Sequence, residues 1–312
     1  MKVKQRYSSL LFKLPTPLTR LATLRQSARS SLLALGALLL LMAACSIPGI
    51  GADKSTLTLL QSSDSAMKQL KTAHVVMNMT STSSLNAGLS TQTIVKMKLN
   101  GDIALPDQSS MQLTLSTAAG SRSIPDINVS MIIMGQKMYI QNSQGKWYLL
   151  DNTLFKGSSG NPFAGSDVTG YNKLLALAQK AAVTDRGTET LNGVSLHHVA
   201  VTFGKESLAD LLKATGQNLP SSQQADLDQL MRNINVSKLT LDLWIDEATS
   251  YVHRMELKMA ITINGVAAPT TSSSGITSDS DIVIDYSKFN EPVTITAPAS
   301  ATPSDNLLSI FR

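Results

Sequence analysis

Few side chains capable of catalysis or metal binding occur in this 312-residue sequence, which holds four histidines and one cysteine. His197 and His198 are adjacent, and adjacent side chains of a strand point to opposite faces, so the two rings are not expected to share a metal ion. His74 and His253 stand alone. Motifs for zinc hydrolysis (HExxH), nucleotide phosphates, a nucleophilic serine elbow and paired cysteines are missing. We therefore expect a protein that is not an enzyme and needs no metal or other cofactor.

The one cysteine, Cys45, follows a segment with the features of an export signal. A basic stretch precedes the apolar run Leu32–Ala44, whose 13 residues fall short of the ~20 that a membrane-spanning helix needs. The run ends in small residues, as a cleavage site requires. A single cysteine in an exported chain has no internal disulfide partner, so it needs another role.

The segment Leu41-Met-Ala-Ala-Cys45 resembles the lipobox of bacterial lipoproteins, with Met42 where that motif usually has leucine. In those proteins the cysteine is acylated and becomes the first residue after cleavage. The resemblance implies a signal peptide over 1–44 and a lipidated Cys45 with a flexible stalk over 45–54. The body would then be held at the extracytoplasmic face of the cell membrane. A soluble secreted protein with an incidental or buried cysteine is the alternative.

The charge distribution argues against a nucleic-acid partner. The formal net charge is +5, but seven of the 27 Lys and Arg precede Cys45 and none of the 22 Asp and Glu does. The remainder has 20 basic against 22 acidic residues and no basic stripe, and aromatic residues make up only 4% of the sequence. We expect no binding to nucleic acid.

Hydrophobic periodicity divides the exported part into one initial helix, many strands and three later helices. Apolar residues recur at helical spacing over 55–71, whereas 75–79, 95–99 and 111–115 alternate between apolar and polar residues, as half-buried strands do. Residues 151–170, rich in glycine and serine, are expected to form a long loop. The other expected elements are hairpins at 128–150 and 188–203, helices at 171–182, 207–215 and 221–232, strands at 235–246, 252–264 and 279–286, and a Ser/Thr loop at 267–280.

This order of elements predicts an α+β fold over 55–298, with a single curved antiparallel sheet wrapped over helices. About ten to eleven strands are too many for one flat sheet, so the sheet must curl. Segment 299–312, rich in Pro, Ala and Ser, is expected to be a disordered tail. We expect the protein to be a monomer.

Several segments resemble the LppX/LprG-type family of bacterial lipoproteins, whose fold is similar to that of the LolA lipoprotein carrier. They are Asp185–Val201, Leu243–Leu257 and Asp285–Pro298, with further similarity in the hairpin residues 135–139 and 146–147. The resemblance implies a LolA-like half-barrel with a large apolar cavity between sheet and helices. It also implies a ligand, since characterised members hold the acyl chains of envelope lipids or glycolipids there.

Methionines are frequent on the apolar faces of the expected strands. Thioether side chains adapt to irregular partners, which suits mobile acyl chains, although methionine also fills ordinary packed cores. The resemblance favours the first interpretation and predicts a protein that binds or carries a lipid, glycolipid or lipidated molecule. The alternative is an envelope lipoprotein with a filled core that uses the same fold for protein interaction or sensing. The residues expected to line the cavity are Met77, Met79, Met97, Met111, Met255, Leu257, Met259 and Ile261.

Overall fold

The computed structural model describes residues 54–85, 92–151, 181–204, 206–207, 232–267, 273–304 and 310. Every described residue belongs to one compact unit, Leu39–Arg312. The expected signal peptide, Cys45, the stalk up to residue 53, the loop after residue 151 and most of the three later helices lie outside the described residues.

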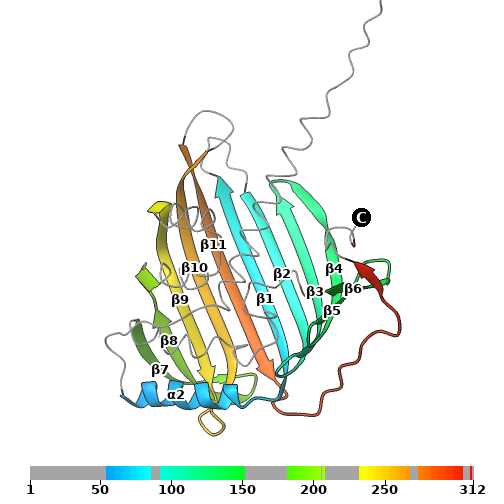
Figure 1. Cartoon of the computed structure of the whole chain (residues 1–312). Coiled ribbons are helices and arrows are strands. Elements are labelled where there is room, and N and C mark those ends of the chain that lie inside the picture. Colours follow the sequence, from blue (N-terminus) through cyan, green and yellow to red (C-terminus); the bar gives the residue numbers. More distant parts are fainter. Residues whose placement is uncertain are drawn as a thin grey trace, which may run out of the picture. The chain divides into compact units, whose positions relative to one another are not determined.

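One sheet of twelve strands forms the described part, and in it two antiparallel meanders meet (Figure 1). Its strands are β1 (Thr72–Leu85), β2 (Gln92–Ala104), β3 (Gln108–Ala119), β4 (Arg122–Met134), β5 (Lys137–Gln141), β6 (Trp147–Asp151), β7 (Ala182–Leu191), β8 (Val194–Thr202), β9 (Ile234–Ile245), β10 (Val252–Ala267), β11 (Ser273–Ser287) and β12 (Thr302–Ser304). The strand order is β12-β6-β5-β4-β3-β2-β1-β11-β10-β9-β8-β7. The meanders β1 to β6 and β7 to β11 therefore join where β1 pairs with β11.

Alternation along the strands gives the sheet one apolar and one polar face. On β1, Val75, Met77 and Met79 are buried, while Asn78 and Thr80, on either side of Met79, are exposed. The register continues the apolar face of β1 into β2 to β6 on one side and into β11, β10, β9 and β8 on the other. Fully buried side chains of this apolar face include Ile103, Ile133, Leu150, Val199, Val201, Leu241, Leu243 and Ile282.

The helix α2 (Lys54–Lys68) confirms the helix predicted over residues 55–71. Its buried residues Thr56, Leu60, Ser63 and Met67 are spaced three and four apart, so they share one side of the helix. Thr56 donates a hydrogen bond to Asp185 of β7, which the register places on the apolar face. α2 therefore lies against the apolar face of the second meander.

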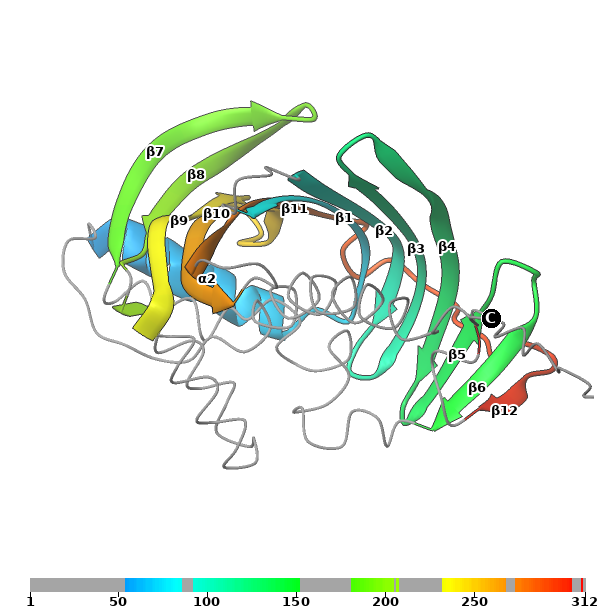
Figure 2. The same cartoon turned by 90° about the horizontal axis from the view of Figure 1, so that it is seen from above.

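The sheet is open and curves around the side on which α2 lies (Figure 2). Bulges interrupt the register of four strand pairs, for example between Leu115 and Thr117 of β3 and between Asp185 and Gly187 of β7. Such bulges bend and twist a strand locally. The predicted single curved antiparallel sheet is confirmed, with one parallel pair, β12 with β6, at its edge.

Two sequence expectations at the far end of the chain need correction. β11 begins at Ser273, so the expected Ser/Thr loop does not extend to residue 280. Ser278 and Ser280 of β11 pair with Ser83 and Ser81 of β1 and take strand positions that apolar residues occupy elsewhere. Segment 299–312 is not wholly a disordered tail, because Thr302–Ser304 forms β12 and Ile310 is buried against the first meander.

A third correction concerns Ala182. It was expected to end a helix, but it begins β7, where its neighbour Val183 is buried in the sheet. A short alternating segment next to an apolar helical pattern is ambiguous in sequence, and pairing with β8 decides it here.

Candidate functional site

All eight residues expected to line a cavity lie on the apolar face, on four strands at the centre of the sheet. Met79 lies opposite Met97, and Met111 lies opposite Gly101. On the other side of β1, the strand β11 lies between β1 and β10, and so between the predicted residues of β1 to β3 and those of β10. Its Ile284 lies between Met77 and Met255, and Ile282 lies between Met79 and Leu257. Met259 and Ile261 extend the same row of β10.

The two isoleucines of β11 belong to the face but were missed as candidates. Their period-two spacing, with Tyr286 as the next member, is the signal that would have found them. Only the pairing of β11 between β1 and β10 shows that they separate the two methionine groups (Figure 1).

Burial of the apolar face is uneven. Five of the methionines named above are buried, whereas Leu257, Met259 and Ile261 of β10 are partly exposed. The face is also partly exposed along β3 and β4, and at Ile127, which lies opposite Leu115, the exposed fraction is 44%. Contiguous exposed apolar surface of this kind is typical of a binding surface. The residues of β3 and β4 concerned are Leu113, Leu115, Val129 and Met131.

The opposite face of the same strands is polar and carries charge. Lys96 and Lys98, which alternate with Met97, are exposed. The ammonium group of Lys258 lies 2.7 Å from Glu256, and this hydrogen bond raises the pKa of Lys258. The guanidinium of Arg254 donates two hydrogen bonds, of 2.6 and 3.0 Å, to Asp285. The two faces of these strands therefore differ sharply in polarity.

A serine patch interrupts the apolar face where β1 and β11 pair. We define it as Ser81, Ser83, Ser278 and Ser280. The hydroxyl oxygens of Ser81 and Ser280 are 2.9 Å apart, and Ser83 donates to Ser278 at 3.2 Å. Ser81 and Ser280 are only 6% and 8% exposed. No role was predicted for these serines. The signal for them in the sequence is the replacement of apolar residues by serine in two otherwise alternating strands.

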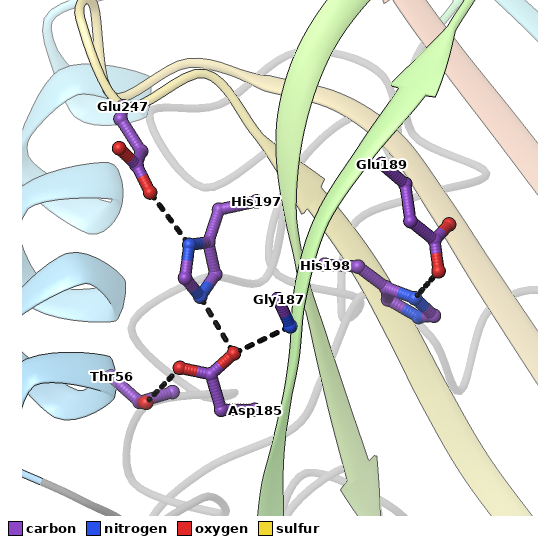
Figure 3. Close-up of polar contacts among 7 residues, drawn as sticks. All are labelled: Thr56, Asp185, Gly187, Glu189, His197, His198 and Glu247. Carbon is purple, nitrogen blue, oxygen red and sulfur yellow. Dashed lines mark hydrogen bonds and ion pairs between the residues drawn. The ribbon is translucent and has the colours of Figure 1, made fainter.

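A polar cluster at the edge of the apolar face joins α2 to the second meander (Figure 3). The ring of His197 contacts two carboxylates, with Nε2 2.9 Å from Asp185 and Nδ1 2.6 Å from Glu247. Asp185 also accepts hydrogen bonds from the backbone of Gly187 at 2.7 Å and from Thr56 at 3.2 Å. The Gly187 bond is the main cause of the lowered pKa of Asp185. We call these five residues the His197 cluster.

His198 projects from the other face of β8, as the alternation of a strand predicted (Figure 3). Its ring lies between Glu189 and Asp242, at 2.8 and 2.7 Å, and stacks on Trp244 with ring centroids 4.3 Å apart. Trp244 in turn donates to Glu189 at 2.9 Å, which is the main cause of the lowered pKa of that carboxyl. The two adjacent histidines thus serve separate clusters on separate faces.

The other two histidines have structural surroundings as well. His74 Nδ1 lies 2.7 Å from Asp102 across the β1–β2 pair. His253 contacts the edge of Phe289, with ring centroids 4.9 Å apart, and its burial lowers its pKa. Within the residues that the structure describes, no three His, Cys, Asp or Glu side chains are arranged to hold a metal ion. No helix in that same part of the chain is long and apolar enough to cross a bilayer.

These features define a protein with a large open antiparallel sheet whose inner, apolar face is lined by methionine and isoleucine and is partly open. Over residues 55–306 the chain matches the family described as "Family of unknown function (DUF6612)", and it belongs to that family. No curated protein matches the chain.

Several solved structures are similar to this one at low sequence identity. The lipoprotein LppX from Mycobacterium tuberculosis is 15% identical, with a TM-score of 0.42, and the match covers 78% of this chain and 100% of that chain. LprF from Mycobacterium bovis is also 15% identical, with a TM-score of 0.38 and coverage of 80% and 99%. A LolA superfamily protein from Nitrosomonas europaea is 10% identical, with a TM-score of 0.23 and coverage of 76% and 93%. The fold described above stands on the strand pairings of this chain itself.

Proposed function

We propose that this protein is an exported lipoprotein that binds or carries a lipid, a glycolipid or a lipidated molecule on the apolar face of its sheet. The observation that carries the proposal is the partial exposure of apolar side chains along β10 and along β3 and β4, on the inner side of a curved sheet. If the apolar face were only part of a core, other parts of the protein would cover it, because leaving apolar area exposed to water costs about 25 cal/mol per Å². Acyl chains covering it would gain about 0.8 kcal/mol per buried methylene group.

Methionines make up much of this face, where Met259 is partly exposed and the other methionines predicted to line the cavity are buried. Met77, Met79, Met97 and Met255 lie in adjoining rows across the sheet, and Met259 extends the row along β10. Unbranched thioether side chains change rotamer at low cost and fit chains of irregular shape. Such a surface binds by shape and burial and requires no reacting group, which agrees with a carrier or binding module.

The test is a pair of tryptophan substitutions, Met97→Trp and Met259→Trp, in the full chain. Membranes containing the protein are irradiated with a photoactivatable, alkyne-tagged palmitic acid, and labelling is measured beside thermal unfolding. We expect labelling of the wild type and a several-fold loss in both variants, with destabilisation below the ~1–3 kcal/mol typical of an overpacked core. Lys98→Trp, on the other face of β2, is the matched control and should label as the wild type does.

Absence of labelling in the wild type, together with strong destabilisation by both tryptophans, would mean a filled core. That result would refute the lipid-binding proposal. It would favour the alternative, an envelope lipoprotein that uses this fold for protein interaction or sensing.

We propose further that Cys45 carries the membrane anchor and places the body at the extracytoplasmic face of the cell membrane. The support is its position as the only cysteine, directly after the apolar run and the small residues. Cys45→Ser should move the body from the membrane fraction to the soluble fraction after cell fractionation. A variant that stays membrane-bound with unchanged mass would contradict the anchor.

A further inference from the structure

The serine patch lies within the apolar face and is not its rim. Along β1 the next apolar residue on one side is Met79, and beyond the patch on the other side Ile276 of β11 pairs with the buried Ile263 of β10. Across the strands, Val95 of β2 lies beside Ser81 and Met259 of β10 lies beside Ser280. The four hydroxyl groups thus have apolar neighbours on these sides, whereas Ser83 has the uncharged but polar Thr93 of β2 beside it.

The hydrogen bonds within the patch do not use its full capacity. Each serine hydroxyl has one donor hydrogen and two acceptor lone pairs. The four side chains make three contacts among themselves, the third joining Ser81 and Ser278 at 3.5 Å. Three contacts use at most three of the four donor hydrogens, so at least one O–H group and several lone pairs of the patch can take a further partner, which Ser83 and Ser278 can reach because they are partly exposed.

The surroundings of the patch select against a charged partner. All the cross-strand and next-row neighbours on the apolar face named above are uncharged. The nearest ion pairs on these strands, such as Lys258 with Glu256, project from the opposite face. A phosphate or carboxylate placed on the patch would lose its hydration without gaining a cation.

We propose that the serine patch binds the uncharged polar linkage of an amphiphilic ligand, an ester or amide carbonyl that accepts the spare O–H group. The acyl chain of that carbonyl then extends over the apolar face on one side of the patch, toward Met79 and Met97, and the part of the ligand beyond the ester oxygen or amide nitrogen lies toward Met259 on the other. This inference rests on the proposed function and adds a defined point of attachment inside the face, which fixes where along the sheet the ligand lies.

Two probes that differ only in the linkage test the inference. One is a photoactivatable, alkyne-tagged dipalmitoylglycerol, and the other is the dihexadecylglycerol with the same photoactive group, in which ether oxygens replace both esters. Each is added to membranes containing the full chain, and the ratio of ester-probe to ether-probe labelling is measured. A hydrogen bond to a neutral carbonyl predicts a ratio of about two to ten in the wild type.

The double variant Ser81→Ala with Ser280→Ala should lower that ratio to near one and leave labelling by the ether probe unchanged. Ser83 and Ser278 are partly exposed, so the double variant Ser83→Ala with Ser278→Ala is less disruptive. It tests the same patch if the first double variant does not fold, and it should also lower the ratio. Thr80→Ala with Thr82→Ala, on the opposite face of β1, is the matched control and should keep the wild-type ratio.

A wild-type ratio of one, or a ratio unchanged in both serine variants, would overturn the serine-patch inference while leaving lipid binding intact. Failure of both probes to label the wild type above the level of Met97→Trp would instead refute the proposed function, and the inference with it.

Discussion

Gly101 of β2 is the residue at which the apolar face leaves no space for a side chain. A Cβ atom placed there would collide with the carbonyl oxygen of Ser110 and would lie 2.8 Å from the sulfur of Met111. Met111 is the cross-strand partner of Gly101, so its side chain occupies the space that the glycine leaves free. One of the predicted ligand-facing methionines is therefore positioned by the absence of a side chain on the next strand.

Gly101→Ala should destabilise the fold by about 1–3 kcal/mol, because β2 and β3 must move apart or Met111 must leave its position. Denaturant unfolding measures the change. Gly204→Ala is the control, since nothing lies within 4 Å of its added Cβ atom, and it should change stability by less than about 1 kcal/mol. Equal effects of the two substitutions would contradict the close approach of β2 and β3.

At the residue scale, the sequence predicted the shared face of the methionines but not the serine patch. Period-two alternation is a local signal, so the side of each strand on which Met77 or Met97 lies could be predicted without the fold. The serine patch could not be predicted, because Ser81 and Ser280 are 199 positions apart and come together only where β1 pairs with β11. Nothing local in either strand indicates that partner.

At the scale of elements, the His197 cluster fastens α2 to the second meander. Asp185 accepts hydrogen bonds from α2 through Thr56, from its own strand through Gly187 and from β8 through His197. The other ring nitrogen of His197 contacts Glu247, which follows β9, so the cluster also includes the turn after that strand. The helix α2 could be predicted from the spacing of its apolar residues. Its attachment could not, because the attachment depends on side chains from three separate elements.

The lowered pKa of Asp185 gives this attachment a pH dependence. A carboxyl whose pKa in the folded protein lies below its ordinary value of 3.8 stabilises the fold above that pH, and this contribution is lost as the pH falls through the lowered pKa. Asp185→Asn should therefore lower the unfolding midpoint at pH 7, and the difference from the wild type should shrink below about pH 4. Melting curves measured from pH 3 to pH 7 test this.

Asp126→Asn is the control for that series, since Asp126 is an exposed carboxylate on β4 in the other meander. It should not change the pH profile. A difference between Asp185→Asn and the wild type that stays constant across the range would show that the loss is steric and not electrostatic.

At the scale of the whole sheet, the fold depends on one long-range junction. Neighbouring hairpins such as β7 with β8 follow from local turns, of which Asn192-Gly193 is a strong example. The pairing of β1 with β11 instead joins strands from the two ends of the described chain, so loop-closure entropy opposes it until the meanders have formed. The curved antiparallel sheet could be predicted from strand number, whereas the strand order could not.

The segment 299–312 protects one edge of that sheet, which composition alone did not predict. β12 pairs with β6, and Ile310 lies in a buried cluster with Ile133, Met138, Ile140 and Leu150. The side-chain amide of Asn142 donates to the carbonyl of Ile310 at 3.3 Å and fixes this contact. Without the segment, β6 would offer unpaired backbone groups to another chain.

Ile310→Ala should therefore destabilise the fold by about 2–4 kcal/mol, as expected when a fully buried isoleucine leaves a cavity. Ile124→Ala is the matched control, because Ile124 of β4 is 50% exposed, and it should cost less than about 1 kcal/mol. Denaturant unfolding of the two variants compares these values.

Deletion of residues 299–312 should in addition convert the expected monomer into oligomers in sedimentation experiments, since it uncovers the edge of β6. Equal stability of the two isoleucine variants, with a monomeric deletion variant, would show that the segment contributes neither packing nor edge protection.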